Sequence, residues 1–400
     1  MTSLLMDHGD GDEEGPFEDG GGPDAMFEGR PYVPPASVSD TQEKPTFAAN
    51  IEKGFVVPAR LKDVPFDLVE TANDWHYAMM NDVPRNEFYR DALARVVTPD
   101  SVVLEIGAGS GLLSIIAASL GARSVVAIEA NQHLANVSRE IIRRNGYEGK
   151  IRIINKMSTD VAAEEVAAHG GVPTVLLSEI LGTLMLGESA LHYVADARRR
   201  LCAPECAVVP RRGCQFATLV HSPDVASITS VKGWDGIDLS WFNSLQDTSM
   251  LVFTKQYGFR FSSCEHKTLA PRLSVLPVDF SADAVGMWRG EHRRRVQVEH
   301  AGTVHAVLAS WEVYAGEVDD LLMATHPDAT LDNFPRDMQW GQGLQLIEDL
   351  STESEAPTPF VVAAGEWLTL VTRFSVDGVS LQFQLERDPP AETEPDGPAD

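Results

Sequence analysis

The stretch SVVLEIGAGSG at residues 101–111 decides the fold class of this chain. A β-branched apolar run leads to an acidic residue, Glu105, and then to glycines at alternate positions, Gly107, Gly109 and Gly111. Because glycine carries no Cβ, this pattern predicts a strand followed by a turn whose backbone closely approaches a ligand.

The next apolar run, SVVAIEA at residues 124–130, ends in Glu129 and Ala130. In nucleotide-binding α/β folds, an acidic residue about 20 positions downstream of the glycine-rich turn accepts hydrogen bonds from the ribose hydroxyls. Glu129 stands at that place. The two stretches together predict a Rossmann-like site for an adenosine-containing ligand.

The glycine spacing indicates which adenosine ligand binds. A dinucleotide fold uses G-x-G-x-x-G, because its pyrophosphate binds at the N-terminus of the following helix. Here the spacing is G-x-G-x-G behind Glu105, which is typical of S-adenosylmethionine (SAM) methyltransferases. A carboxylate there would repel a pyrophosphate and attract the ammonium and sulfonium groups of SAM. A dinucleotide enzyme and a purely structural turn are the alternatives that the motif leaves open.

Length and composition indicate a soluble protein of two domains. The chain has 400 residues, 44% of them hydrophobic, which is more than a single core usually contains. No apolar run approaches the length of a membrane span, and the N-terminus is acidic where a signal peptide would be basic. We therefore expect an intracellular protein without membrane contact, in the cytoplasm and with the nucleus as a second candidate location.

The charge and the cysteines exclude some functions. A net charge of -27 argues against a broad basic face for nucleic acid and favours Arg- or Lys-rich partners. We expect the short arginine clusters at 198–200, 211–212 and 293–295 to be solvated faces. The cysteines lack the spacing of a metal site, so we expect free buried thiols and no metal. They are Cys202, Cys206, Cys214 and Cys264.

Polarity patterns divide the chain into five segments. Residues 1–46 and 388–400 are rich in Gly, Asp, Glu and Pro and are predicted to be disordered acidic tails. Helical periodicity predicts that residues 47–98 form N-terminal helices that cover the site. An alternation of strands and helices makes 99–209 the Rossmann-like SAM-binding domain. Short β-rich runs predict an antiparallel β-barrel-like domain at 210–387.

An apolar insert at about 222–248 interrupts the β-rich domain. So many large apolar side chains should not be left in solvent. The insert could pack within its own domain or enter a second subunit, and composition leaves both readings open. The side chains are Val225, Ile228, Val231, Trp234, Ile237, Leu239, Trp241 and Phe242.

After the fourth predicted strand, residues 178–188 read SEILGTLMLGE and place Glu179 and Glu188 on one loop. Such a loop is ordinarily solvated surface, but here it resembles the double-glutamate loop of the protein arginine N-methyltransferases. The same resemblance is carried by MMNDVPR at 79–85 and NKMSTD at 155–160.

A fourth segment, MQWGQ at 338–342, lies where that family has its Thr-His-Trp loop. The resemblance spans about residues 72–385. It is strongest to the type III, monomethylating branch, in a form with one catalytic module. It implies SAM as cofactor, Arg-rich protein substrates such as RNA-binding proteins or histones, and a homodimer formed through the insert, which we call the arm.

The resemblance also implies roles for single residues. In the cofactor site, Arg85 would bind the SAM carboxylate, and Glu105 and Ala130 would complete the set. The remaining cofactor residues are Gly107, Gly109 and Gly111 for the methionine and ribose, Glu129 for the ribose hydroxyls, and Met157 with Ser158 for the adenine.

In the substrate site, Glu179 and Glu188 would be catalytic residues that hold the substrate guanidinium. Met79, Gln339 and Trp340 would contact the substrate, with Trp340 closing the pocket. One departure matters. Many family members pair the loop histidine with an aspartate, but here Gln339 takes the histidine's place although Asp82 is present. No His–Asp proton relay is then available at that position.

Three function classes follow from the sequence. The leading one is transfer of one methyl group from SAM to an ω-nitrogen of arginine in proteins. A dimethylating arginine methyltransferase and a small-molecule SAM methyltransferase are the enzymatic alternatives, and a scaffold without catalysis is the third class. Two glutamates followed by a β-rich domain and an arm favour the first class.

Overall fold

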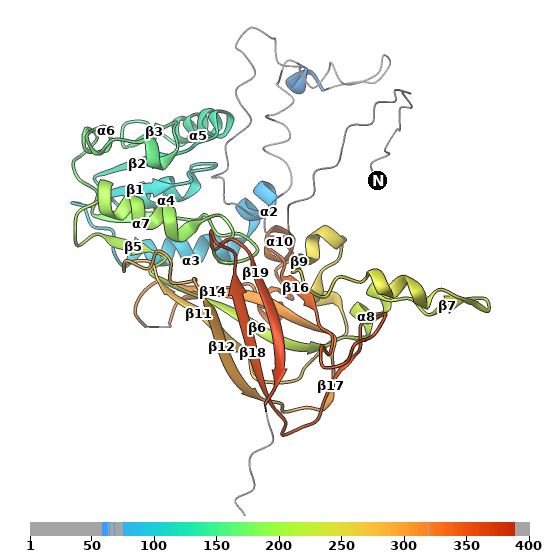
Figure 1. Ribbon diagram of the computed structural model, residues 1–400. Coiled ribbons are helices and arrows are strands. Elements are labelled where there is room, and N and C mark those ends of the chain that lie inside the picture. Colours follow the sequence, from blue (N-terminus) through green and yellow to red (C-terminus); the bar gives the residue numbers. More distant parts are fainter. Residues whose placement is uncertain (1–57, 63, 65–67, 69–74, 319, 389–400) are drawn as a thin grey trace, which may run out of the picture. The chain divides into compact units, whose positions relative to one another are not determined.

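The computed structural model describes residues 58–62, 64, 68, 75–318 and 320–388 (Figure 1). The predicted acidic tail at 1–46 lies outside the described residues, as does the predicted tail at 388–400 except for its first residue. Most of the segment 47–74 is likewise outside them.

A five-stranded parallel sheet contains the glycine-rich stretch (Figure 1). Its strands are ordered β3-β2-β1-β4-β5, so the direction of winding reverses between β1 and β4. Ligands of open parallel sheets bind at such a switch point, outside the carboxyl ends of the strands. The bounds are β1 Val102–Ile106, β2 Ser124–Ile128, β3 Ile151–Ile154, β4 Val175–Ser178 and β5 Ala207–Val209.

Helices alternate with these strands, as the sequence predicts. β1 and β2 are buried at every position, because apolar side chains cover both faces of a parallel sheet. Asn131 caps the longest of the covering helices with its side chain. The helical elements are α4 Leu112–Ser119, α5 Gln132–Arg144, the 3₁₀ turn η4 Ser158–Asp160, α6 Ala163–Ala167 and α7 Ala190–Leu201.

Among the residues from 75 onward, helices α2 Trp75–Asn81 and α3 Val83–Ala94 precede the sheet. Phe88, Tyr89 and Leu93 on α3 are buried and belong to the same apolar core as the sheet. A further short 3₁₀ turn, η3, spans Ala59–Leu61. The carboxyl edge of the sheet is therefore bordered by α3.

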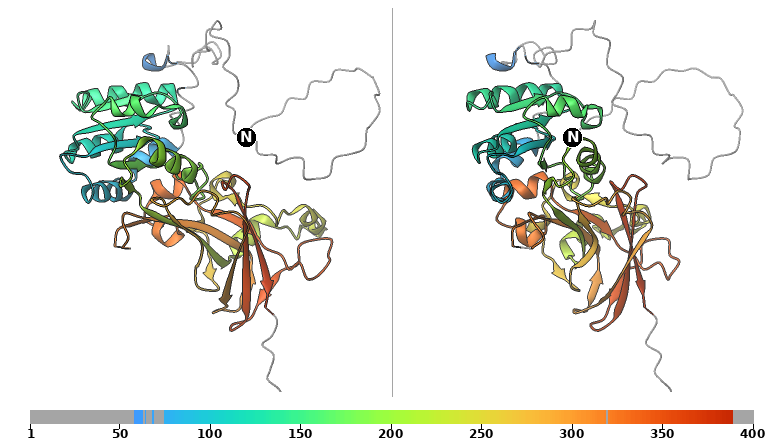
Figure 2. Two further views of the ribbon diagram at one scale, coloured as in Figure 1. Left: turned by 60° about the vertical axis from the view of Figure 1, so that its left-hand side comes forward. Right: turned by 90° about the vertical axis from the view of Figure 1, so that its left-hand side faces the viewer.

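The second half of the chain forms antiparallel sheets. One has seven strands, in the order β10-β6-β14-β16-β9 with β11 beside β6 and β15 beside β14, and another has the order β12-β18-β19 (Figure 2). The bounds are β6 Arg212–His221, β9 Val252–Phe253, β10 Lys267–Thr268, β11 Leu273–Asp279, β12 Glu291–Gln297, β13 Gly302–Val304, β14 Ala306–Tyr314, β15 Leu322–Ala324, β16 Gly343–Leu346, β17 Phe360–Val362, β18 Trp367–Phe374 and β19 Leu381–Arg387.

The remaining short elements connect these strands. β13 pairs with β17. Helices α9 Pro327–Thr330 and α10 Phe334–Gln339 precede β16, and the latter places Gln339 and Trp340. The 3₁₀ turns η6 Thr254–Tyr257 and η7 Phe261–Ser263 follow β9.

Two stretches of the β-rich half differ from what local polarity suggests. The β-rich run SMLVFTK at 249–255 contains only the two-residue strand Val252–Phe253 before the 3₁₀ turn η6 begins. The arginine cluster at 293–295 lies in strand β12, which the sequence analysis did not predict, and Arg293 and Arg295 are exposed, as expected of a solvated face. Its arginines form ion pairs with carboxylates of β19 and its flank, among them Arg293 with Glu386 and Arg295 with Asp388. Paired charges therefore hid a strand that apolar periodicity does not mark.

The arm consists of helix α8 Pro223–Thr229, the hairpin of β7 Gly233–Trp234 with β8 Ile237–Asp238, and the 3₁₀ turn η5 Ser240–Leu245. It extends away from the antiparallel sheets (Figure 1). Only Val225 is buried in the core. Trp234 is 73% exposed, and Trp241 and Phe242 are each 68% exposed.

The cysteines are all free thiols. Cys206 and Cys214 are buried, whereas Cys202 and Cys264 are only partly buried. Within the described residues, no three His, Cys, Asp or Glu side chains gather as a metal site would require. No helix in the described part of the chain has the length and apolarity needed to cross a membrane.

Candidate active site

The glycine-rich turn follows β1 at the switch point of the sheet. The amide of Gly107 donates to the carbonyl of Ile128 at 3.0 Å, so the turn is tied to the end of β2. Gly107 and Gly109 both have positive φ, +75° and +52°, which favours glycine. A Cβ on Gly107 would lie 2.7 Å from Cγ2 of Ile180, whereas nothing lies within 4 Å of a Cβ built on Gly109. The turn thus touches protein on one side and is open on the other.

Glu129 fixes the edge of this open space. One carboxylate oxygen accepts the amide of Gly109 at 2.8 Å, and the other accepts the amide of Asn131 at 2.8 Å. The residue is only 7% exposed. Asn155 donates to the carbonyls of Glu129 and Ala130, while Ala130 itself is exposed. A carboxylate held in this way keeps its remaining lone pairs in a fixed direction, as binding of a diol requires.

Glu105 lies beneath the turn and is 1% exposed. Burial raises its pKa to about 8, although a hydrogen bond from the Ser114 hydroxyl opposes the shift. The side chain is therefore mostly protonated at pH 7, which revises the expectation of a permanent anion. A cationic ligand nearby would lower this pKa and restore the charge.

The predicted adenine segment is held by a residue that the sequence analysis placed on a solvated face. Ser158 is buried and Met157 is 41% exposed. Arg200 of α7 donates to the carbonyls of Ser158 at 3.0 Å and Val161 at 2.9 Å, and it also pairs with Asp196. Tertiary packing brings Arg200 to η4, so no local sequence pattern predicts this contact.

The double-glutamate loop follows β4, next to the glycine turn. Three side chains from the β-rich half hold its backbone. The indole of Trp340 donates to the carbonyl of Leu181 at 2.7 Å, and that of Trp311 donates to Gly182 at 2.9 Å. The side-chain oxygen of Gln215 accepts the amide of Met185 at 3.0 Å. An irregular buried loop needs such partners, because its main-chain polar groups are not paired with a neighbouring strand.

Trp340 is 2% exposed and packs edge to face on Trp311 with ring centroids 4.9 Å apart. Its carbonyl accepts the hydroxyl of Thr183 at 2.7 Å. This position makes Trp340 a support beneath the loop. Its predicted contact with substrate stays a prediction.

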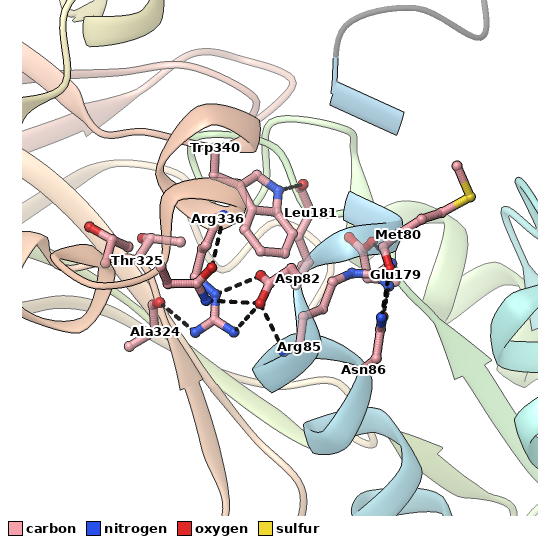
Figure 3. A network of polar contacts seen from close by, with 12 residues as sticks. Met80, Asp82, Arg85, Asn86, Glu179, Leu181, Ala324, Thr325, Arg336 and Trp340 are labelled. Carbon is pink, nitrogen blue, oxygen red and sulfur yellow. Dashed lines mark hydrogen bonds and ion pairs between the residues drawn. The ribbon is translucent and has the colours of Figure 1, made fainter. Parts of the chain in front are cut away.

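Glu179 forms a buried ion pair with Arg85, and the two side chains are 4% and 5% exposed (Figure 3). Burial alone would lower the pKa of Arg85, but the charge of Glu179 and its hydrogen bond, together with Tyr89 and Asp82, outweigh burial and the pKa is raised. Arg85 also donates to Asn86 at 2.9 Å and lies over the Tyr89 ring at 5.5 Å. The sequence analysis assigned Arg85 to the cofactor and Glu179 to the substrate, and the structure brings the two together.

Glu188, at the other end of the loop, is exposed and has no ion pair among the described residues. Desolvation by the surrounding protein and, second, the charge of Glu179 raise its pKa to about 7, while Lys255 opposes the shift. Lys255 lies in η6 and donates to the carbonyl of Gln339 at 3.3 Å. Gln339 is 5% exposed, and its buried side-chain oxygen accepts no hydrogen bond from the part of the chain that the structure describes. The sequence analysis did not identify Lys255 as part of this site.

Asp82 is fully buried and is the N-cap of α3. Arg336 of α10 donates to it from Nε at 2.8 Å and from a terminal nitrogen at 3.1 Å (Figure 3). Asn333 donates to it at 2.8 Å, and the amide of Arg85 at 3.0 Å. The predicted absence of a His–Asp relay agrees with this geometry, since the aspartate is occupied by Arg336. Met79, predicted to contact substrate, is half-buried on α2 just before Asp82.

Three features of the structure fit SAM. Gly109 is open where a ligand would approach, and the carboxylate of Glu129 is fixed at the edge of that space. The Nε of Arg85 is buried and has no hydrogen-bond partner among the described residues, so it could serve a ligand carboxylate. The predicted cofactor residues therefore offer groups suited to the ribose and to the carboxylate of SAM, although their individual roles stay predictions.

The comparisons with known proteins agree with this geometry. The family described as ribosomal protein L11 methyltransferase (PrmA) matches residues 90–188. An arginine N(omega)-methyltransferase of Streptomyces achromogenes subsp. streptozoticus is 30% identical over 296 residues, which cover 74% of each chain. The chain belongs to the family of arginine N-methyltransferases. The resemblance found in the sequence is thereby confirmed.

Protein arginine N-methyltransferase 7 of Bos taurus is 36% identical over 293 residues. These cover 68% of this methyltransferase but 41% of the cattle protein, so the chain spans less than half the length of that relative.

Solved structures show the same fold. The Trypanosoma brucei PRMT1 enzyme–prozyme heterotetrameric complex with AdoHcy has a TM-score of 0.63 at 22% identity, over 78% of this chain and 92% of that chain. Protein arginine methyltransferase 10 of Arabidopsis thaliana has a TM-score of 0.60 at 18% identity, over 80% and 93%. The predicted combination of a Rossmann-like methyltransferase domain with an antiparallel β domain is confirmed.

Proposed function

We propose that this methyltransferase transfers one methyl group from SAM to an ω-nitrogen of arginine in protein substrates. One observation carries the proposal most directly: Glu179 already holds a guanidinium, that of Arg85, in a buried ion pair. A second carboxylate, Glu188, lies on the same loop and is unpaired within the described residues. A site of this composition is suited to a second guanidinium.

Arginine needs such help, because its guanidinium is always protonated in water and is a poor nucleophile. SAM, when bound, supplies an electrophilic methyl group. Glu179 and Glu188 bind the guanidinium and draw its positive charge away from the nitrogen that faces the methyl. Glu188, with its pKa raised to about 7, can then accept the proton released from the product. Asp82 cannot, because its oxygens already accept hydrogen bonds from Arg336, Asn333 and Arg85.

The nature of the acceptor is the first point to test. The net charge of -27 favours basic protein substrates. The name of the Streptomyces relative specifies arginine rather than protein arginine, so free arginine is the alternative acceptor. Mass spectrometry after incubation with SAM and either an Arg-rich peptide or free L-arginine distinguishes the two. Methylation of the peptide alone supports the proposal, methylation of L-arginine alone replaces the substrate class, and methylation of neither refutes it.

The product number follows from the space around Glu188. Gln339 is long, polar and buried, and its carbonyl accepts a hydrogen bond from Lys255, whose charge acts on Glu188. We propose that this crowding stops the reaction at monomethylarginine. Glu188→Asp with Gln339→Ala keeps a carboxylate and removes volume, so it should release some dimethylarginine from the same peptide. Abundant dimethylarginine from the wild type would reject the type III assignment and leave arginine methylation intact.

We also propose a homodimer formed through the arm. Trp234, Trp241 and Phe242 expose large apolar surfaces that a free monomer does not need. The double variant Trp234→Ala/Trp241→Ala should be monomeric and less active. Light scattering that still reports a dimer would exclude the arm as the interface.

The cofactor site has its own test. Glu129→Ala should weaken SAM binding by about 1.5 to 3 kcal/mol, the size of a hydrogen bond to a charged group. Calorimetry with SAM and with NAD checks this, since tight binding of NAD by the wild type would overturn the cofactor assignment.

A further inference from the structure

The region between α3 and α10 contains an ion pair that the proposed chemistry does not use. Asp82 and Arg336 are 0% and 5% exposed, and 254 positions in the chain separate them. A buried pair of charges stabilises little unless its hydrogen bonds are complete. Here they are: Asp82 accepts four hydrogen bonds, and the second terminal nitrogen of Arg336 donates to the carbonyl of Ala324 at 3.2 Å.

The pair joins the first turns of two helices. Asp82 is the N-cap of α3, and Asn333 is the N-cap of α10. The side chain of Asn333 accepts the amide of Arg336 and donates to Asp82, so the two caps are bonded to each other. Helix N-termini carry partial positive charge, and two that face one another repel unless an anion lies between them. Asp82 is that anion.

The same first turn of α3 carries Arg85, three residues after Asp82. Asp82 accepts the amide of Arg85, and the side chain of Arg85 reaches Glu179 on the double-glutamate loop. A continuous series of polar contacts therefore runs from α10, through the N-terminus of α3, to Glu179 (Figure 3).

We propose that Arg336 is a positioning residue of the active site, which clamps Asp82 and so sets where Arg85 meets Glu179. This inference rests on the proposed function for its activity readout. A displacement of about 1 Å at a reacting group costs about a hundredfold in rate. Arg336 thus acts on catalysis through Arg85, without touching substrate or cofactor itself.

The test uses full-length protein and four variants. Arg336→Met leaves the buried carboxylate of Asp82 without a cation. Arg336→Lys keeps the positive charge but loses the bidentate contact with Asp82. The double variant Asp82→Asn/Arg336→Met removes both charges. Asp332→Asn is the matched control, because it removes an exposed carboxylate one position before Asn333. Circular dichroism selects a temperature at which every variant is folded.

For Arg336→Met we expect a fall of about a hundredfold in kcat/KM for the peptide and a higher KM for SAM. Arg336→Lys should recover part of the loss, and the double variant should be less impaired than Arg336→Met. Asp332→Asn should match the wild type. A folded Arg336→Met with wild-type kcat and KM would overturn the proposal, and so would an Arg336→Lys no better than Arg336→Met.

The double variant separates positioning from simple loss of stability. Arg336→Met leaves the buried carboxylate of Asp82 without its cation, whereas the double variant has no such unpaired charge. At a temperature where both variants are folded, the difference between them in kcat/KM and in KM for SAM should therefore persist. If Arg336→Met does not fold, the comparison of Arg336→Lys with the wild type decides. Should the wild type methylate no arginine at all, the proposed function fails, and binding of S-adenosylhomocysteine to the same variants still tests the clamp.

Discussion

The two carboxylates of the double-glutamate loop differ in burial, in ion pairing and in pKa. Glu179 is buried and paired with Arg85, whereas Glu188 is exposed and has a pKa raised to about 7. Glu179 is thus held by a fixed cation, whereas Glu188 can exchange a proton near neutral pH. The comparison teaches that one loop can supply both an anchor and a base, because its two ends lie in different surroundings.

The largest effect should come from Glu179→Gln. It removes the anchor for the substrate and leaves the guanidinium of Arg85 buried without its partner. We expect kcat/KM to fall about a thousandfold or more, as when a charge-stabilising group is removed. SAM binding should also weaken, which differs from the expectation, based on sequence, that this carboxylate serves substrate alone.

Steady-state kinetics and calorimetry with SAM measure the two losses. Glu355→Gln is the control, because Glu355 is an exposed loop carboxylate. Full SAM affinity in Glu179→Gln would mean that Arg85 does not depend on this pair to meet the cofactor.

Glu188→Gln should have the second largest effect. Without its base the enzyme should lose about a hundredfold in kcat, the contribution of general acid–base catalysis. SAM affinity should stay unchanged, since Glu188 makes no contact with Arg85 among the described hydrogen bonds. If Glu188→Gln weakened SAM binding as strongly as Glu179→Gln, the division of labour between the two ends would be wrong.

A third prediction sharpens the role of Glu188 through pH. The carboxyl group must be deprotonated to accept a proton, so kcat/KM should rise with pH and level off above about pH 7. The charge of Lys255 lowers this pKa, so Lys255→Met should raise it and move the rising limb to higher pH. The limb should vanish in Glu188→Gln. A limb that persists there would assign the ionisation to another group.

The smallest effect concerns the support of the loop. Trp340→Phe removes the indole donor to the carbonyl of Leu181 and leaves that buried oxygen unpaired. We expect a loss of about 1 to 3 kcal/mol in the free energy of unfolding, measured with denaturant. Activity should fall only modestly at a temperature where the variant is folded. A loss of activity as large as that of Glu188→Gln would instead support the prediction that Trp340 contacts the substrate directly.

The sequence predicted the parallel sheet well and the β-rich half less completely. Strands β1, β2 and β4 are short apolar runs, and Gly107 directly follows the first, so the local composition marks them. Strand β12 carries consecutive arginines that are neutralised by Glu386 and other carboxylates far along the chain. No local pattern shows that pairing.

The residues of the candidate site likewise fall into two groups, those that a local pattern predicts and those that tertiary packing places. The glycine turn, Glu129 and the two loop glutamates follow their strands directly and could be located from spacing. Arg336, Arg200 and Lys255 reach the site from other elements. Arg336 pairs with Asp82, 254 positions away, and Arg200 and Lys255 donate to the main-chain oxygens of Ser158 and Gln339. Contacts of this kind depend on tertiary packing, which a single sequence does not display.

The close approach of Gly107 to Ile180 limits how this protein can evolve. A side chain as small as alanine at position 107 would meet Ile180, the neighbour of Glu179, at 2.7 Å. The turn expected to hold the cofactor and the loop expected to hold the acceptor are thus separated by one aliphatic side chain. A larger side chain in the glycine turn would displace the double-glutamate loop, and a larger side chain at Ile180 would displace the turn. Changes that broaden the range of acceptors should therefore accumulate on the opposite side of the pocket, among the residues supplied by the β-rich half.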